Sequence, residues 1–191
     1  MRKAGDWFLS LVVLFGFGFL LLAAGATLWL LCRCIPRPRS GQRKVLLCLV
    51  PSGFEEIAQK GVSSLISERE EDGFLTHVYS IYFPSERWGR LPWSPRQSIW
   101  KIPRVARRWR QWGFRDLFEI LNGLTLLGTL LVIAPWVRRR IDLIRGQDPA
   151  IMGAAAFWLS FLTGIPYCVS IHADHKKRYH LDPKRGTVAF G

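Results

Sequence analysis

Uncharged residues gather in a few long runs, and the longest, of 26 residues, extends from Trp7 to Cys32. A hydrocarbon core about 30 Å thick requires roughly 20 apolar helical residues, so this run predicts a transmembrane helix. Trp7 and Trp29 lie near its ends, and tryptophan rings favour the headgroup region. A cleavable signal peptide would have a shorter apolar region of about 7–15 residues. We therefore predict an N-terminal anchor that is retained.

The basic residues on the two sides of this run predict its orientation. Arg2 and Lys3 precede it, and five basic residues follow it: Arg33, Arg37, Arg39, Arg43 and Lys44. The more positive flank tends to stay in the cytoplasm, so a single span places the rest of the chain on the cytoplasmic side. The four cysteines are then expected to be reduced and unpaired.

Two further uncharged runs, Ile120–Val137 and Pro149–Ile171, are also long enough to cross a bilayer. Basic residues flank both runs, whereas the loops of a multi-span protein alternate between positive and neutral. Asn122 with Gly123 and then Pro135 interrupt the first run, and Gly164-Ile165-Pro166 interrupts the second. We predict that both runs are buried elements of a folded domain. A small polytopic membrane protein is the alternative.

The rest of the chain alternates between strand and helix patterns. Short runs rich in apolar, β-branched or aromatic residues predict strands, and longer runs with helical spacing predict helices. The predicted strands are Val45–Val50, Phe74–Phe83, Ile141–Arg145 and Tyr167–His172, and the predicted helices are one around Val62–Ile66 that ends near Gly73, Leu124–Arg140 and Ala150–Leu162. This alternation predicts an α/β domain, a parallel sheet wrapped by helices, over residues 45–191. Residues 1–44 form the anchor and a basic linker.

Residues 84–115 are basic and rich in tryptophan, with nine Lys or Arg, one acidic residue and five of the nine Trp. Apolar positions from Ile102 to Trp112 would share one face of a helix that spans Lys101–Trp112. We predict that this segment lies in the membrane interface, with its arginines on anionic headgroups. The residues expected to do so are Trp100, Arg104, Arg108, Trp109 and Trp112.

Other interpretations of this segment remain open. The formal net charge of +13 also fits a nucleic acid, but a chain tethered to a bilayer favours lipid, and we expect no nucleic-acid partner. A basic surface loop with incidental tryptophans is the third interpretation.

Ligands of open α/β sheets bind beyond the carboxyl ends of the strands. Three segments are predicted there, and their candidate ligand-binding residues are Gly53, Phe54, Gly61, Arg145, Gln147, Asp148, His172, Asp174 and His175. Structural roles compete with binding, because Asp148 before Pro149 suits a helix cap and His175 suits a solvated turn. The cysteines form no CxxC pair, and we expect no metal site.

Two of these segments resemble motifs of the family 4 glycosyltransferases, which have the GT-B fold. IDLIRGQDPAIMG is similar to a turn in which Asp, His or Gln, Pro and Gly lead into a helix, and TGIPYCVSIHAD is similar to a strand that begins Gly-Ile-Pro and ends in His. The matching residues are Asp142, Gln147, Pro149, Gly153, Gly164, Pro166, Ser170 and His172. VLLCLVPSGF is similar to the first strand and acceptor loop of that family, without its usual Gly-Gly.

The resemblance implies an amino-terminal, acceptor-side half with a Rossmann-like sheet, truncated before the half that binds the nucleotide sugar. It implies sugar transfer from a nucleotide-sugar co-substrate, without a cofactor, to a membrane-bound or envelope-polysaccharide acceptor once a donor half completes the site. That half would be a further segment or a separate polypeptide. His172 would be the catalytic residue that orients or polarises the transferring sugar. The sequence contains no DxD motif, so it does not indicate a metal-dependent site instead. A membrane adaptor or degenerate half without activity is the non-enzymatic alternative.

Overall fold

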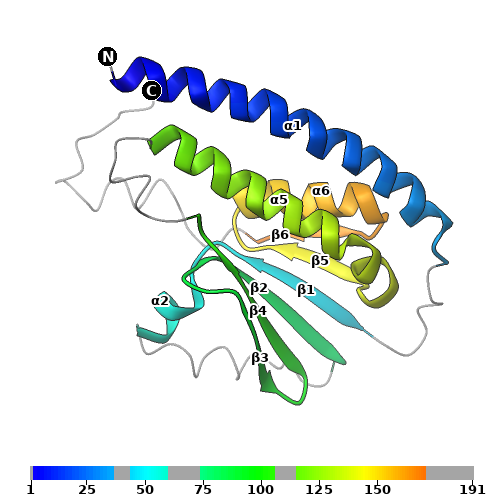
Figure 1. The fold of residues 1–191 in the computed structure, drawn as a ribbon. Helices are drawn as coiled ribbons and strands as arrows, with labels where there is room; N and C mark the ends of the chain where they lie inside the picture. The colour runs from blue at the N-terminus through cyan, green and yellow to red at the C-terminus, as the bar shows by residue number, and fades with distance from the viewer. Residues whose placement is uncertain (1, 37–43, 60–73, 106–114, 171–191) are drawn as a thin grey trace, which may run out of the picture.

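The computed structural model describes residues 2–36, 44–59, 74–105 and 115–170, which form four helices and a six-stranded sheet (Figure 1). The helices are α1 (Arg2–Cys34), α2 (Phe54–Gln59), α5 (Arg115–Arg140) and α6 (Ile151–Thr163). The strands are β1 (Val45–Val50), β2 (His77–Ser85), β3 (Gly89–Ser94), β4 (Gln97–Pro103), β5 (Leu143–Gly146) and β6 (Tyr167–Val169). The predicted α/β class is confirmed.

The strands follow the order β3-β4-β2-β1-β5-β6 across the sheet. All neighbouring strands are parallel except β3, which is antiparallel to β4. The sheet is therefore mixed, and the prediction of a wholly parallel sheet is wrong at this edge. The five parallel strands end on the same side, which we call the carboxyl edge.

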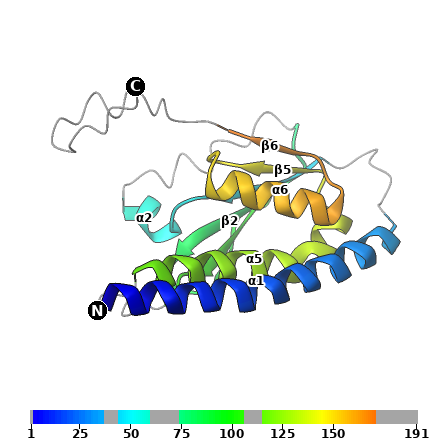
Figure 2. The ribbon, with the colours of Figure 1, turned by 90° about the horizontal axis from the view of Figure 1, so that it is seen from above.

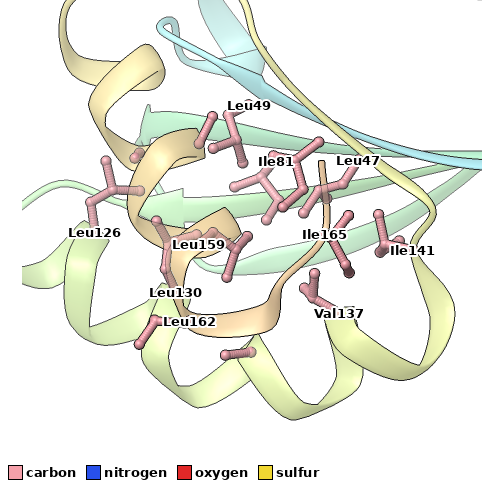
Figure 3. Packing of buried hydrophobic residues seen from close by; sticks show 14 of the residues in the cluster. Leu47, Leu49, Ile81, Leu126, Leu130, Val137, Ile141, Leu159, Leu162 and Ile165 are labelled. Atoms are coloured by element: carbon pink, nitrogen blue, oxygen red, sulfur yellow. The ribbon is translucent and has the colours of Figure 1, made fainter. Parts of the chain in front are cut away.

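Helices α5 and α6 cover one face of the sheet, which we call the α5 face. Side chains from β1, β2, α5 and α6 interlock there in the larger of two hydrophobic clusters (Figure 3). All six residues of β1 are buried, as expected for a strand in the middle of a sheet that is covered on both faces. Residues at the centre of this cluster are Leu47, Leu49, Ile81, Leu126, Leu130, Val137, Leu159 and Leu162.

The opposite face of the sheet, which we call the α2 face, carries a smaller cluster. Leu46, Cys48 and Val50 of β1 point to this face, because side chains alternate along a strand. Phe54 of α2 packs on them, with its ring edge-on to Tyr82 at a centroid distance of 5.5 Å. Most of the buried hydrophobic residues therefore lie on the α5 face, and fewer lie on the α2 face.

Helix α1 lies along α5 and also touches α6, on the side of these helices that faces away from the sheet (Figures 1 and 2). The Trp29 ring stacks on Phe161 at a centroid distance of 6.2 Å. Gly25 meets the Trp158 ring so closely that an added Cβ would lie 2.9 Å from it. Helix α1 is therefore part of the helical layer in this structure.

Helices α1 and α5 run in the same direction. Leu21 lies against Gly128 near the middle of α5. Arg138, near the end of α5, donates from Nε to the Ile35 carbonyl just beyond α1 at 3.0 Å, and from a terminal nitrogen to the Thr163 carbonyl at the end of α6. One guanidinium thus joins the carboxyl ends of all three helices.

Two helices in the described residues are long and apolar enough to cross a membrane, over Trp7–Cys34 and Leu117–Arg140.

Helix α5 begins nine residues before its predicted start at Leu124. Asn122 with Gly123 was expected to interrupt the run, but Asn122 is buried within the helix and its Oδ1 accepts a hydrogen bond from the Val105 amide at 2.8 Å. The helix also continues through Pro135, which was expected to interrupt it. The prediction that Ile120–Val137 is a buried element holds for one side of the helix, where Leu126, Leu130 and Val137 enter the core, whereas Val132 is 79% exposed.

Residues 89–103 of the basic segment form a β-hairpin, β3 and β4, so no helix starts at Lys101. Trp100 belongs to β4 and packs against Tyr79 and Trp136, at centroid distances of 6.1 and 4.8 Å. The Arg104 amide donates to the Ser85 carbonyl at 3.0 Å beyond the end of β4. The predicted helix is therefore wrong over its first residues, and Arg108, Trp109 and Trp112 lie outside the described residues.

The other boundaries differ by smaller amounts. Strand β1 has its predicted bounds, and α6 is displaced by one residue. Strand β2 begins at His77 rather than Phe74, and β5 is shifted toward Gly146. The predicted helix around Val62–Ile66 lies outside the described residues.

Candidate functional site

The order in which the chain adds strands to the sheet changes direction between β1 and β5. From β1 it moves outward to β2 and β4, and then returns through α5 to β5 and β6 on the other side. The loops after β1 and β5 therefore leave the carboxyl edge in opposite directions. In open α/β sheets a ligand binds in the crevice at such a switch point.

The loop after β1 passes very close to the end of β2. A Cβ built on Gly53 would lie 2.7 Å from the Pro84 carbonyl oxygen, so this position requires glycine. Phe54, which follows, is buried between Tyr82 and Trp93, with centroid distances of 5.5 and 5.4 Å. Both predicted ligand residues thus have structural roles in shaping this loop.

An ion pair joins α2, which follows this loop, to β4. Lys101 Nζ lies 3.0 Å from Glu55 Oε1, and both side chains are partly buried. Burial alone would raise the pKa of the Glu55 carboxyl, but hydrogen bonds from backbone amides at Glu55 and Glu86 and the charge of Lys101 together lower it below its ordinary value. The carboxylate is therefore ionised at neutral pH.

The turn from β5 into α6 is tightly built around two glycines. A Cβ on Gly146 would lie 2.7 Å from the Met152 carbonyl oxygen, and one on Gly153 would lie 2.9 Å from the Asp148 carbonyl oxygen. The Asp148 carboxylate accepts hydrogen bonds from the Ala150 amide at 2.8 Å and the Met152 amide at 3.3 Å. Asp148 thus binds the first turn of α6, although the N-cap residue itself is Ala150 and Pro149 precedes the helix.

Arg145 and Ser170 meet at the ends of β5 and β6. Arg145 Nε donates to Ser170 Oγ at 2.6 Å, and the Ser170 amide donates to the Gly146 carbonyl at 2.8 Å. The Gln147 amide donates to the Leu49 carbonyl of β1 at 3.0 Å, which keeps Gln147 at the same edge. The Arg145 guanidinium thus lies at the carboxyl edge, partly buried and held by Ser170.

Arg145, Gln147 and Asp148 are thus brought together at the switch point, and Gly53 and Phe54 lie at the neighbouring loop. Gly61, His172, Asp174 and His175 lie outside the described residues. Among the residues that the structure describes, no three His, Cys, Asp or Glu side chains form a group that could hold a metal ion.

Sequence reasoning missed the Glu55–Lys101 pair and the role of Ser170 as the partner of Arg145. The pair joins residues 46 positions apart, and its prediction required the hairpin that we did not predict. The sequence did indicate a role for Ser170, because this residue belongs to the motif that ends in His172.

Comparisons with known proteins do not show a family. No family model and no curated protein matches the chain. One solved structure that it matches is the carboxy-terminal domain of a hydrogenase from Pyrococcus furiosus, with a TM-score of 0.36 and 14% identity, over 71% of this chain and 96% of that one.

Proposed function

We propose that this chain is the acceptor-side half of a membrane-attached glycosyltransferase of the GT-B type. The half would bind a membrane-bound or envelope-polysaccharide acceptor. A donor half, from further chain or a second polypeptide, would bind the nucleotide sugar. The acceptor hydroxyl oxygen would then form the new bond to the anomeric carbon of the sugar, the bond from that carbon to the nucleotide diphosphate would break, and the hydroxyl proton would be released.

The observation that carries this proposal is the β5–α6–β6 unit at the switch point. Numbered along the chain, the five parallel strands have the spatial order 3-2-1-4-5, which a Rossmann-like half requires. The residues that match the family motifs have roles consistent with this unit, since Gly153 permits the close turn and Ser170 holds Arg145. His172 follows Ser170 by two residues in the sequence, which favours a position near the same edge.

We further propose that α1 attaches the domain to the membrane as a single crossing, with the sheet in the cytoplasm. The parallel direction of α1 and α5 supports one crossing rather than two. If both crossed, β1 after α1 and β4 before α5 would lie on opposite sides of the bilayer, although both pair with β2. Residues 104–114 are too few, and too rich in arginine, to return through the bilayer as a helix.

Sugar transfer in reconstituted membranes tests the proposed activity. The full chain is placed in vesicles with lipid and polysaccharide extracts, a GT-B donor half is supplied in trans or fused after Gly191, and labelled nucleotide sugars are added in turn. We expect label to enter the acceptor fraction only when both halves are present. Incorporation by the chain alone, or none with any donor half and nucleotide sugar, would contradict the proposal.

His172→Ala and His175→Ala form a matched pair for the catalytic residue. A group that orients or polarises the reacting sugar typically contributes about 10²–10⁴-fold, so His172→Ala should lower kcat by that factor. His175→Ala should change kcat far less. The reverse order would show that the motif is wrongly aligned at the end of this strand.

A further inference from the structure

The outward side of α6 is apolar although it is exposed. Ile151, Phe157 and Phe161 are 61%, 55% and 52% exposed, and together with exposed Ala154 they follow one another at intervals of three or four residues along the helix. The helix contains no charged residue. A helix of a globular protein that faces water carries polar residues on that side, so this face is built for a partner other than water.

This face is continuous with α1. Phe161 stacks on Trp29 of α1 and on Trp158, and Phe157 contacts Tyr167 edge-on at a centroid distance of 5.9 Å. Phe15 and Phe19 of α1 are 72% and 73% exposed. We call the outward sides of α1 and α6 together the helical surface.

Positive charge lies at one end of the helical surface. Arg33 at the end of α1 and Arg139 and Arg140 at the end of α5 are exposed, and the Arg33 guanidinium lies 5.2 Å from the centre of the Trp29 ring. An apolar face that ends in tryptophan and arginine is complementary to a bilayer, with hydrocarbon against the rings and anionic headgroups against the cations. A second copy of this chain fits less well, because two chains that each carry +13 repel one another.

We propose that the helical surface rests on an anionic lipid bilayer, so that the whole domain lies on the membrane rather than hanging from its linker. This inference rests on the proposed attachment through α1, and it concerns the orientation of the domain. When α1 enters the bilayer, it uncovers Trp158 and Leu131, which add to the apolar face. The α2 face of the sheet then points away from the membrane, and the carboxyl edge opens sideways along it (Figure 2).

The proposal differs from the interface segment that the sequence predicted. That segment would bring residues 84–115 to the lipid, including Trp88, which is 65% exposed. Trp88 precedes β3, the edge strand of the sheet, and Figure 1 shows this edge at the bottom of the view, away from α1 at the top. Phe157 and Trp88 are therefore matched exposed aromatics that separate the two hypotheses.

Photo-crosslinking in vesicles tests the orientation. In the full chain, p-benzoyl-phenylalanine replaces Phe157, Phe161 or Trp88, one position at a time, and each variant is reconstituted in phosphatidylcholine vesicles that contain phosphatidylglycerol. Because all three side chains are exposed, the variants should keep the circular dichroism spectrum of the parent. After illumination, mass spectrometry measures lipid adducts and gel electrophoresis measures crosslinked dimers. We expect at least several-fold more lipid adduct at Phe157 and Phe161 than at Trp88.

Three results would overturn the proposal, and they differ in what else they affect. Equal or greater lipid adduct at Trp88, in a chain that sediments with the vesicles, would reject the orientation and leave the attachment intact. Dimers at Phe157 in place of lipid adducts would assign the helical surface to a second copy. A chain that does not sediment with the vesicles would reject both the orientation and the proposed attachment.

Discussion

Helices α1 and α5 are both long and apolar, but they differ in what covers them. Leu126, Leu130 and Val137 of α5 are buried between the helix and the sheet. Helix α1 has only a narrow buried stripe, which includes Gly25 and Cys32, and the rest of its surface is exposed. By length and hydropathy alone both helices could cross a membrane. Their packing differs, because α5 has a side buried in the core of the α/β domain whereas most of the surface of α1 is exposed.

The largest expected effect comes from shortening a side chain on the buried side of α5. Leu130→Ala removes a fully buried side chain from the larger cluster, and such truncations cost about 2–5 kcal/mol of the free energy of unfolding. Phe15→Ala in α1, where the ring is largely exposed, should change that free energy by less than about 0.5 kcal/mol. Denaturant unfolding of both variants in the same detergent measures the difference. Equal losses of unfolding free energy would show that this side of α1 is packed as tightly as the buried side of α5.

The next effect concerns the junction between the two helices. Arg138→Met removes the hydrogen bonds to the Ile35 and Thr163 carbonyls, and bonds from a charged donor contribute about 1.5–3 kcal/mol. We expect a loss in that range, together with faster proteolysis after Cys34 as the end of α1 loosens. Arg139→Met is the control, because Arg139 is exposed. The free energy of unfolding of this variant should stay near that of the parent protein. A loss with Arg139→Met as large as with Arg138→Met would contradict this role.

The smallest expected change in stability comes from adding one methyl group to each helix, by a Gly→Ala substitution. Gly123 lies in α5 with open space around it, so Gly123→Ala should stabilise the protein by about 0.5–1 kcal/mol through helix propensity. Gly25→Ala in α1 should gain less or lose stability, because the new Cβ would lie 2.9 Å from the Trp158 ring. Thermal unfolding of the pair in the same detergent gives the sign. A stabilising Gly25→Ala of equal size would mean that α1 does not pack on α6.

The sequence allowed the buried strand β1 and helix α6 to be located, because each is a compact apolar run between turn residues. It did not allow the β3–β4 hairpin to be recognised. Ile99 and Ile102 of β4 enter clusters on opposite faces of the sheet, so β4 lacks the polar alternation that marks a strand. The start of α5 was missed because Asn122 resembles a turn residue, whereas the fold satisfies its side chain through the distant Val105 amide.

At the candidate site, local signals were interpretable and long-range contacts were not. The hydrogen bonds of the Asp148 carboxylate at the start of α6 agree with the sequence, but α6 begins at Ile151, so Pro149 is not its first residue as predicted. The contacts of Arg145 with Ser170 and of Glu55 with Lys101 depend on which strands become neighbours, and that order follows from packing across the whole sheet. Phe54 was expected at a ligand, and only the position of Trp93 on the hairpin shows that its ring is enclosed.

Protease accessibility in sealed membrane vesicles of known orientation tests most directly whether α5 is a core helix and α1 the membrane helix. Epitope tags are placed before Met1, between Pro95 and Arg96 in the exposed turn of the hairpin, and after Gly191 of the full chain. We predict that the tags at Pro95 and Gly191 are digested from the cytoplasmic face of the membrane, while the N-terminal tag is protected. Digestion of the Pro95 and Gly191 tags from opposite faces of the membrane would show that α5 crosses it and would contradict the account.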